Sequence, residues 1–167
     1  MRAPIRKGHA RLGQKPDPYL TERKFRELEA KLVRMKESRP KLAVEVKRLA
    51  EMGDFSENAG YQLAKGKLRG LNQRIIDLEN HLKTAVIIEA DKNSSVVQIG
   101  SQVTVEREGR QKLYTILGST ESDPDRNVIS YLSPLGAGLI GRQVGEIVKV
   151  ELVAGREIVL KIINIEQ

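Results

Sequence analysis

The sequence predicts an α+β protein in which a long antiparallel α-helical coiled-coil hairpin is followed by a small antiparallel β-sheet domain with one short helix. Apolar residues recur at alternating steps of three and four residues over 19–90, which is the spacing of a coiled-coil seam. After residue 95 the pattern changes to short segments rich in Val and Ile, separated by turn residues, which is typical of strands.

This pattern divides the chain into three parts. Residues 1–18 contain three prolines, two glycines and five Lys or Arg without apolar periodicity, which predicts a flexible basic arm. Residues 19–90 form the hairpin, with its tip near residues 53–58. Residues 91–167 form the C-terminal domain.

Two apolar seams on either side of one chain reversal predict the hairpin. Thr21 is a weak N-cap candidate for the first helix. Pro40 interrupts the first seam, and we expect a kink or a local break there because proline removes a backbone donor. Gly53 is expected to end the first helix in the left-handed conformation. Two seams joined by a tight turn should pack against each other. The seam residues are Phe25, Leu28, Leu32, Met35, Leu42, Val46 and Leu49 in the first helix, and Leu68, Leu71, Ile75, Leu78, Leu82 and Ala85 in the second.

The C-terminal domain is predicted from strand-like segments and turn signals. Pro134 near a first turn and Gly141 after a last turn predict one short helix between them. The turn signals are Glu108-Gly109, Asp123-Pro124 and Ala154-Gly155. The expected strands cover residues 96–99, 102–106, 112–117, 128–132, 147–153 and 157–165.

Composition limits the function. The chain has no Cys, which excludes disulfides and thiolate metal sites, and its two His, His9 and His81, are far apart. No apolar run approaches the roughly 20 residues that cross a bilayer, and no signal peptide is evident. We therefore expect a soluble, cytoplasmic protein without membrane contact. The net charge of +7 belongs to the N-terminal half. Such asymmetry suits a polyanionic partner, although a solvated charged surface has the same pattern.

Two carboxylates, Asp54 and Glu57, lie three residues apart at the reversal. With Asp54 opening the second helix, this spacing would be a capping box that only stabilises the helix. On the end of a long hairpin, the same pair could share a Mg²⁺ ion whose other ligands come from elsewhere. Phe55 lies between the acids, and would either contact a partner or fold back on the first helix. The residues by themselves leave both readings open.

The run from Gly53 to Tyr61, Gly-Asp-Phe-Ser-Glu-Asn-Ala-Gly-Tyr, resembles the Gly-Asp-x-x-Glu-Asn-Ala-(Asp/Glu)-Tyr motif of bacterial GreA/GreB transcript cleavage factors. The stretch 129–136 and the shorter runs 139–141 and 144–146 also resemble that family, and the similarity covers about residues 19–167. This resemblance implies that the C-terminal domain is FKBP-like.

The resemblance also implies a function. The hairpin would enter the secondary channel of bacterial RNA polymerase and stimulate the polymerase to cleave its backtracked RNA, so the chain itself would not be an enzyme. Asp54 and Glu57 would be the catalytic acids. They would bind Mg²⁺ only together with the polymerase, and the chain alone would hold no metal tightly. The residues implied to shape the tip are Phe55, Ser56, Asn58 and Tyr61.

Two further surfaces are implied for a factor that acts as a monomer. A basic surface on the second helix would contact the 3′ segment of the nascent RNA, and its residues are Lys65, Lys67, Arg69 and Arg74. These cations could equally be ordinary solvated residues. A segment of the C-terminal domain would contact the polymerase: Ser133, Pro134, Leu135 and Gly136.

The chain departs from the family pattern at two places. Gly60 replaces the acid that usually precedes the tyrosine, and Ala137-Gly138 stands where relatives often have Lys-Ala. Three alternatives remain open. The first is a channel-binding inhibitor of the same architecture, which a more crowded acidic tip would indicate. The second is a coiled-coil chaperone or adaptor, for which Phe55 is the only support in the sequence. The third is a free-standing metal-dependent nuclease, but no further metal ligands accompany Asp54 and Glu57.

Overall fold

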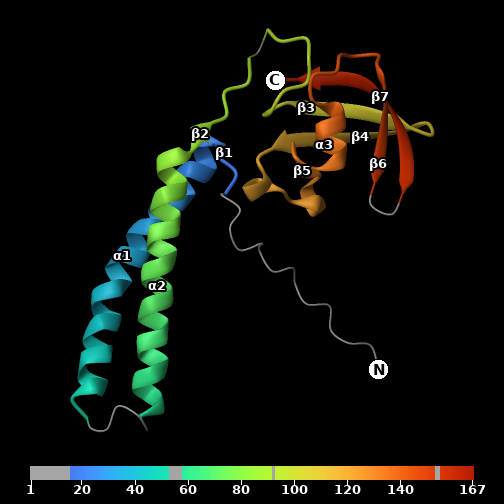
Figure 1. Cartoon of the computed structure of the whole chain (residues 1–167). Coiled ribbons are helices and arrows are strands. Elements are labelled where there is room, and N and C mark those ends of the chain that lie inside the picture. Colours follow the sequence, from blue (N-terminus) through green and yellow to red (C-terminus); the bar gives the residue numbers. More distant parts are fainter. Residues whose placement is uncertain (1–15, 53–57, 92, 153–154) are drawn as a thin grey trace, which may run out of the picture.

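The computed structural model describes residues 16–52, 58–91, 93–152 and 155–167, and shows a long helical hairpin whose base adjoins a small β domain (Figure 1). This is the α+β architecture that the sequence predicts. Among the described residues, no helix combines the length and the hydropathy that would span a membrane.

The first helix, α1, spans Glu22–Ala50. It begins at Thr21, whose hydroxyl accepts the backbone N–H of Lys24 at 3.2 Å, so the N-cap prediction is confirmed. Pro40 lies inside the helix, which continues without a break. One lost backbone hydrogen bond is therefore tolerated, because most of the stability of such a helix comes from packing its apolar face.

The second helix, α2, spans Ala59–Thr84 and packs along α1 in antiparallel fashion (Figure 1). Leu28 of α1 and Leu71 and Ile75 of α2 are buried in the seam between them. Lys36 reaches across the seam to Glu79, with 2.6 Å between their charged atoms. The ammonium of Lys36 and its hydrogen bond lower the pKa of the Glu79 carboxyl. At about 1.5 Å per residue, α2 is roughly 39 Å long.

A two-stranded parallel sheet closes the base of the hairpin, and the sequence pattern did not indicate it. Strand β1 (Tyr19–Leu20) pairs with β2 (Val86–Ile87), directly before α1 and after α2. Leu20 is fully buried there, and Asp17 is only 8% exposed. Assigning Asp17 to a flexible arm was therefore wrong, because this residue is part of the folded base.

The C-terminal domain is a five-stranded sheet in the order β5-β4-β3-β7-β6. The sheet is mixed, because β5 runs parallel to β4, so the prediction of a purely antiparallel sheet was wrong for this pair. Two short 3-10 turns, Ser119–Glu121 and Pro124–Arg126, connect β4 to β5 and allow the parallel return. The strands are β3 (Gln102–Arg107), β4 (Arg110–Leu117), β5 (Val128–Ser130), β6 (Ile147–Leu152) and β7 (Arg156–Glu166).

Two local signals of this domain, the turn at Glu108-Gly109 and the short helix after Pro134, are confirmed, whereas the first expected strand is absent from the described residues. Glu108 and Gly109 both have positive φ and form the tight turn between β3 and β4. Helix α3 spans Pro134–Leu139, where a helix was expected. Residues 96–99 form no strand; Val96 makes only an isolated bridge to Gln143. One face of the sheet and α3 enclose the core, which includes Val103, Val105, Ile116, Leu139, Leu160 and Ile162.

Candidate functional site

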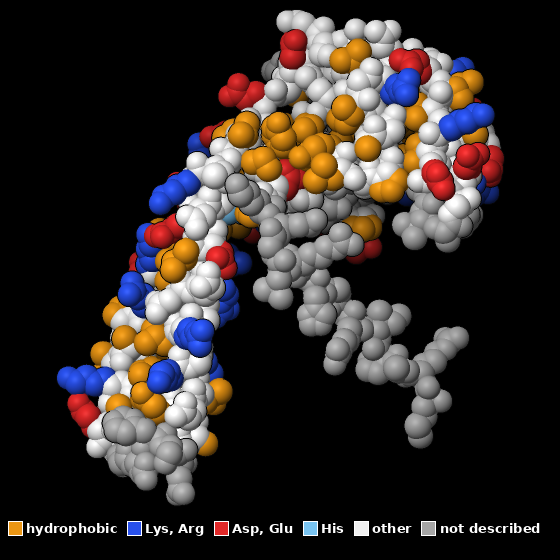
Figure 2. Space-filling view, viewed as in Figure 1, with side chains coloured by type: hydrophobic (Ala, Val, Ile, Leu, Met, Phe, Trp, Pro, Cys, Tyr) orange, Lys and Arg blue, Asp and Glu red, His pale blue; other side chains and the backbone are white. Residues whose placement is uncertain are grey.

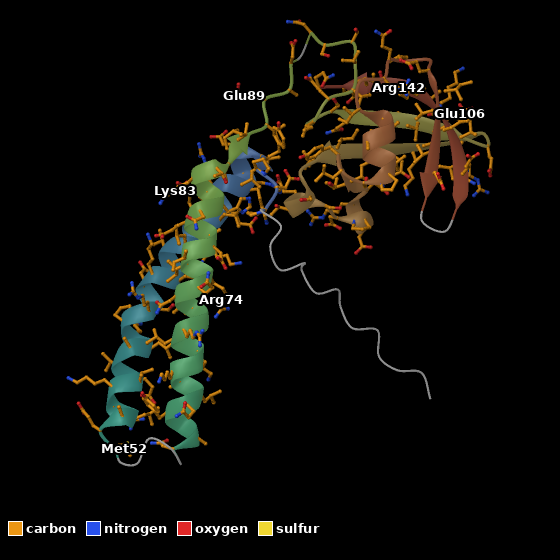
Figure 3. All side chains as sticks on the ribbon, viewed as in Figure 1. Met52, Arg74, Lys83, Glu89, Glu106 and Arg142 are labelled. Carbon is orange, nitrogen blue, oxygen red and sulfur yellow. The ribbon has the colours of Figure 1, made fainter. Side chains whose placement is uncertain are left out.

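The chain reversal lies at the end of the hairpin that is farthest from the C-terminal domain. Met52 and Asn58 flank it, and Figure 3 shows Met52 at that end. The predicted tip residues Asp54, Phe55, Ser56 and Glu57 lie outside the described residues. What the structure does describe is the pair of helix ends on either side of this segment.

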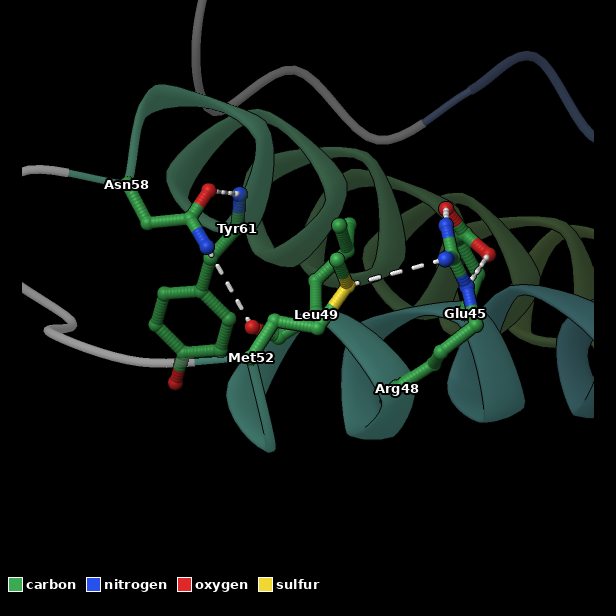
Figure 4. Close-up of polar contacts among 6 residues, drawn as sticks. All are labelled: Glu45, Arg48, Leu49, Met52, Asn58 and Tyr61. Atoms are coloured by element: carbon green, nitrogen blue, oxygen red, sulfur yellow. Dashed lines mark hydrogen bonds and ion pairs between the residues drawn. The ribbon is translucent and has the colours of Figure 1, made fainter.

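Asn58 connects the two helix ends (Figure 4). Its side-chain oxygen accepts the backbone N–H of Tyr61 at 3.0 Å, which makes it the N-cap of α2. Its side-chain nitrogen donates to the backbone carbonyl of Leu49, near the end of α1, at 3.3 Å. The second helix therefore begins at Ala59 with Asn58 as its N-cap, whereas the capping-box reading placed Asp54 at that position and Glu57 one turn on. Because Asn58 provides the cap, those two acids are not needed to start α2.

Replacing Asn58 by alanine is expected to lower the free energy of unfolding by about 1–2 kcal/mol, because an N-cap and a link between the helices are lost together. Urea denaturation followed by circular dichroism would measure this loss. Asn80→Ala, on the exposed side of α2, is the matched control and should change little. Asn58→Asp should recover only the capping part of the loss, since aspartate accepts the N–H of Tyr61 but cannot donate to the carbonyl of Leu49. Equal effects of Asn58→Ala and Asn80→Ala would contradict the role of Asn58.

The last turn of α1 is held by a charged cluster next to the reversal (Figure 4). The guanidinium of Arg48 donates to both carboxylate oxygens of Glu45, at 3.0 and 2.9 Å, and to the sulfur of Met52 at 3.6 Å. This contact lowers the pKa of Glu45 and raises that of Arg48. On α2, the ammonium of Lys65 lies 5.5 Å from the ring centre of Tyr61.

The four cations proposed to contact RNA do not form one patch. Lys65 and Arg69 are four residues apart and share one flank of α2, whereas Lys67 and Arg74 are seven apart and share the opposite flank. Arg74 folds back along the helix, with its Nε donating to the carbonyl of Gly70 at 3.1 Å. A bound polyanion would therefore meet two separate rows of positive charge.

The face between these two rows carries two glycines, Gly66 and Gly70. At both Gly66 and Gly70, an added Cβ would meet nothing within 4 Å. A shallow groove along this face is lined by Gln62, Leu63, Gly66, Lys67, Gly70, Gln73 and Arg74. Near the tip, Gly60 leaves the first turn of α2 without an acidic residue, so the helix lacks the stabilisation that an acid gives at this end.

The predicted polymerase-binding segment is used by the fold itself. Ser133 caps α3 by accepting the N–H of Gly136 at 3.1 Å, and its hydroxyl donates to the carbonyl of Ser130 at 2.6 Å. Leu135 packs against the core. Of the four residues, only Pro134 is exposed. The neighbouring Leu132 is 62% exposed, and the sequence analysis did not single it out.

The Gly138 departure has a packing reason. An added Cβ would lie 2.9 Å from a methyl carbon of Val150 and 3.5 Å from one of Val148, both on β6. Glycine therefore lets α3 lie close to the sheet.

Metal ligands do not converge within the part of the chain that the structure describes. No group of three or more His, Asp or Glu side chains there could hold a metal ion. Asp54 and Glu57, outside the described residues, would supply two carboxylates. Mg²⁺ prefers six oxygen ligands, and such a pair suits it only as part of a shared site.

A long two-helix projection on a small mixed β domain defines the structural class of this protein. Family models match nearly all of the described chain: "Transcription elongation factor, N-terminal" over residues 18–87 and "Transcription elongation factor, GreA/GreB, C-term" over residues 92–167. The chain therefore belongs to the GreA/GreB family of transcription elongation factors.

Individual relatives agree with this assignment. Transcription elongation factor GreA of Staphylococcus saprophyticus is 40% identical over 150 residues, which cover 88% of this chain and 95% of that protein. GreA of Geobacillus kaustophilus is 40% identical over 151 residues, again covering 88% and 95%. Among solved structures, GreA factor homolog 1 (Gfh1) of Thermus thermophilus is 25% identical, with a TM-score of 0.40 and coverage of 89% of this chain and 98% of that one.

Proposed function

We propose that this elongation factor binds bacterial RNA polymerase through the secondary channel and stimulates Mg²⁺-dependent cleavage of backtracked RNA in the cytoplasm, rescuing arrested complexes. The nuclease centre belongs to the polymerase, and the hairpin contributes acids to it. The observation that carries the proposal is the position of the reversal. A helix of 26 residues separates Asn58 from the C-terminal domain, so the segment with Asp54 and Glu57 can reach deep into a channel while that domain stays outside.

In this proposal Asp54 and Glu57 act at the end of the probe, and Asn58 sets their position through its bonds to both helices. A Mg²⁺ ion shared with the polymerase would lower the pKa of a bound water and stabilise the leaving oxygen. The two cationic rows of α2 would contact the extruded 3′ segment of the RNA. Because RNA phosphates release counterions when they bind cations, this contribution should weaken as salt rises.

The test is a stalled, backtracked bacterial elongation complex with labelled RNA and Mg²⁺. The wild-type chain should speed RNA shortening, and Asp54→Ala/Glu57→Ala should lower the rate at saturation on the order of 100-fold, as when a preorganised electrostatic group is removed. The double variant should still compete with the wild type for polymerase, and neither should cut free RNA.

Glu51→Ala is the matched control for this experiment. Glu51 is an exposed acid next to the reversal, and its carboxylate lies 3.9 Å from the ammonium of Lys47. Its removal should leave the rate nearly unchanged. Suppression of cleavage by the wild type would favour an inhibitor of the same architecture, and no binding to polymerase would overturn the proposal.

A further inference from the structure

The hairpin and the C-terminal domain meet at a joint whose charged residues the proposed function does not use. Residues 16–21 pass between the base of the hairpin and the loops that follow β4 and β5 (Figure 1). Apolar side chains gather on the surface where the two parts meet (Figure 2). Within this joint Asp17 is 8% exposed, which is unusual for an aspartate.

Asp17 joins three parts of the chain. One carboxylate oxygen accepts the backbone N–H of Ser119 at 2.6 Å. The other accepts the hydroxyl of Tyr131 at 3.4 Å and the backbone N–H of Tyr19 at 3.1 Å. Its backbone carbonyl lies 2.9 Å from Nε2 of His81, near the end of α2, which donates to it. The residue therefore binds the hairpin base and two loops of the C-terminal domain together.

A second acid makes a parallel connection. Glu121 accepts the backbone N–H of Thr21 at 2.8 Å and the hydroxyl of Thr21 at 2.6 Å. Thr21 is also the N-cap of α1. A residue of the C-terminal domain thus holds the residue at which the hairpin begins.

Close packing supports both connections. At Gly118, an added Cβ would lie 2.1 Å from the backbone oxygen of Tyr19. The loop after β4 therefore packs directly against the backbone of residues 16–21. The rings of Tyr19 and Tyr131 pack edge to face, with 5.5 Å between their centroids. Burial, and then the carboxylate of Asp17, raise the pKa of Tyr131 above its usual value.

The buried carboxylate of Asp17 depends on its hydrogen-bond donors. Among the residues that the structure describes, the donors to the carboxylate of Asp17 are the backbone N–H groups of Tyr19 and Ser119 and the hydroxyl of Tyr131, and no Lys or Arg there forms an ion pair with it. A buried carboxylate is costly unless such donors are in place. Any rotation of the hairpin relative to the C-terminal domain would break several of these hydrogen bonds at once.

We propose that Asp17 and Glu121 are positioning residues that fix the direction of the hairpin relative to the C-terminal domain. We call the contacts of Asp17 with Ser119 and Tyr131, and of Glu121 with Thr21, the interdomain latch. The consequence for activity rests on the proposed function. When the C-terminal domain is bound at the channel entrance, a hairpin of fixed orientation already points along the channel. Without the latch, only a fraction of the molecules would have the orientation that allows the hairpin to enter.

The latch can be tested in the free protein, independently of polymerase. The chain has no Cys, so Gln73→Cys on α2 and Gln111→Cys on β4 provide two unique exposed sites for spin labels. The distance distribution between the labels should be narrow in the otherwise wild-type protein. It should broaden or shift in Asp17→Asn, which replaces one of the two acceptor oxygens by an NH2 donor, so that Ser119 on one side and Tyr19 with Tyr131 on the other cannot all keep their acceptor. The same is expected of Glu121→Ala, which removes both acceptors of Thr21.

Asp125→Asn is the matched control, because Asp125 is an exposed acid in the same loop region and its removal should leave the distribution unchanged. Circular dichroism would check that each variant is folded. If Asp17→Asn fails to fold, Glu121→Ala decides the question, since Glu121 is only partly buried. Distributions in Asp17→Asn and Glu121→Ala that equal those of the wild type and of Asp125→Asn would overturn the proposal.

The cleavage assay provides the second readout. If only about a tenth of the latch-variant molecules have the hairpin orientation that enters the channel, the concentration for half-maximal stimulation should rise about tenfold. The rate at saturation should stay close to that of the wild type. A variant of the tip acids should show the opposite pattern, with a lower saturating rate. A wild-type chain that fails to stimulate cleavage would overturn the proposed function, and the distance measurement would still decide on the latch.

Discussion

Gly136→Ala is expected to destabilise the C-terminal domain by about 3 kcal/mol, at the upper end of what overpacking in a core usually costs. An added Cβ at this position would lie 2.1 Å from the backbone oxygen of Ser130 and 2.9 Å from its carbonyl carbon. Both are backbone atoms, so no side chain can rotate away to relieve the contact. The same carbonyl accepts the N–H and the hydroxyl of Ser133, so a displacement would also disturb the cap of α3.

Urea denaturation of the full chain, with hydrogen exchange of the amides in β3 and β7, would measure the loss in that domain. Gly66→Ala is the matched control, because an added Cβ there meets nothing within 4 Å on the surface of α2. That change should instead stabilise the protein by about 0.5–1 kcal/mol, since glycine is unfavourable inside a helix. Similar effects of the two substitutions would show that the contact at Gly136 is not restrictive.

This expectation also affects how polymerase contacts are tested. A variant at Ser133 or Gly136 would weaken binding by damaging the fold, whatever its contacts with a partner. Leu132→Ala and Pro134→Ala change exposed side chains and leave the cap of α3 intact. These two variants therefore separate the surface of this segment from its structural role.

Ile162→Ala should cost about 2–5 kcal/mol, the usual range when a large aliphatic side chain is removed from a core. Ile162 is fully buried in β7, the strand between β3 and β6, and belongs to the main core cluster. Its truncation leaves a cavity that β3 and β6 cannot close, because both are hydrogen-bonded to the same strand.

Thermal and urea unfolding of the C-terminal domain would measure this effect. Val159→Ala is the control on the same strand, since Val159 is 50% exposed on the other face of the sheet. It should cost less than about 1 kcal/mol, because little apolar surface is removed from a packed environment. A loss at Val159 as large as that at Ile162 would mean that the outer face of the sheet is packed as well.

The hairpin could be predicted from the sequence because its signal is local and repeated. Seam residues such as Leu28, Leu71 and Ile75 recur with helical spacing, and burying them requires only the neighbouring helix. A kink or a local break was expected at Pro40, and the helix continues without a break, because packing along the whole helix outweighs one missing hydrogen bond. Both Asp54 and Asn58 are good capping residues, and only the fold shows that Asn58 caps α2 and also reaches Leu49.

The sequence by itself determined the two-part α+β organisation, the reversal with its acids and the family motifs, since these depend on residue order and short spacing. The tertiary structure decided how the two parts meet. Asp17 and Tyr131 are 114 residues apart, and Thr21 and Glu121 are 100 apart. No periodicity links such distant residues, and hydrogen bonds to backbone N–H groups leave no side-chain pattern to read. The folded chain brings these residues together, and their contacts set the direction in which the hairpin points.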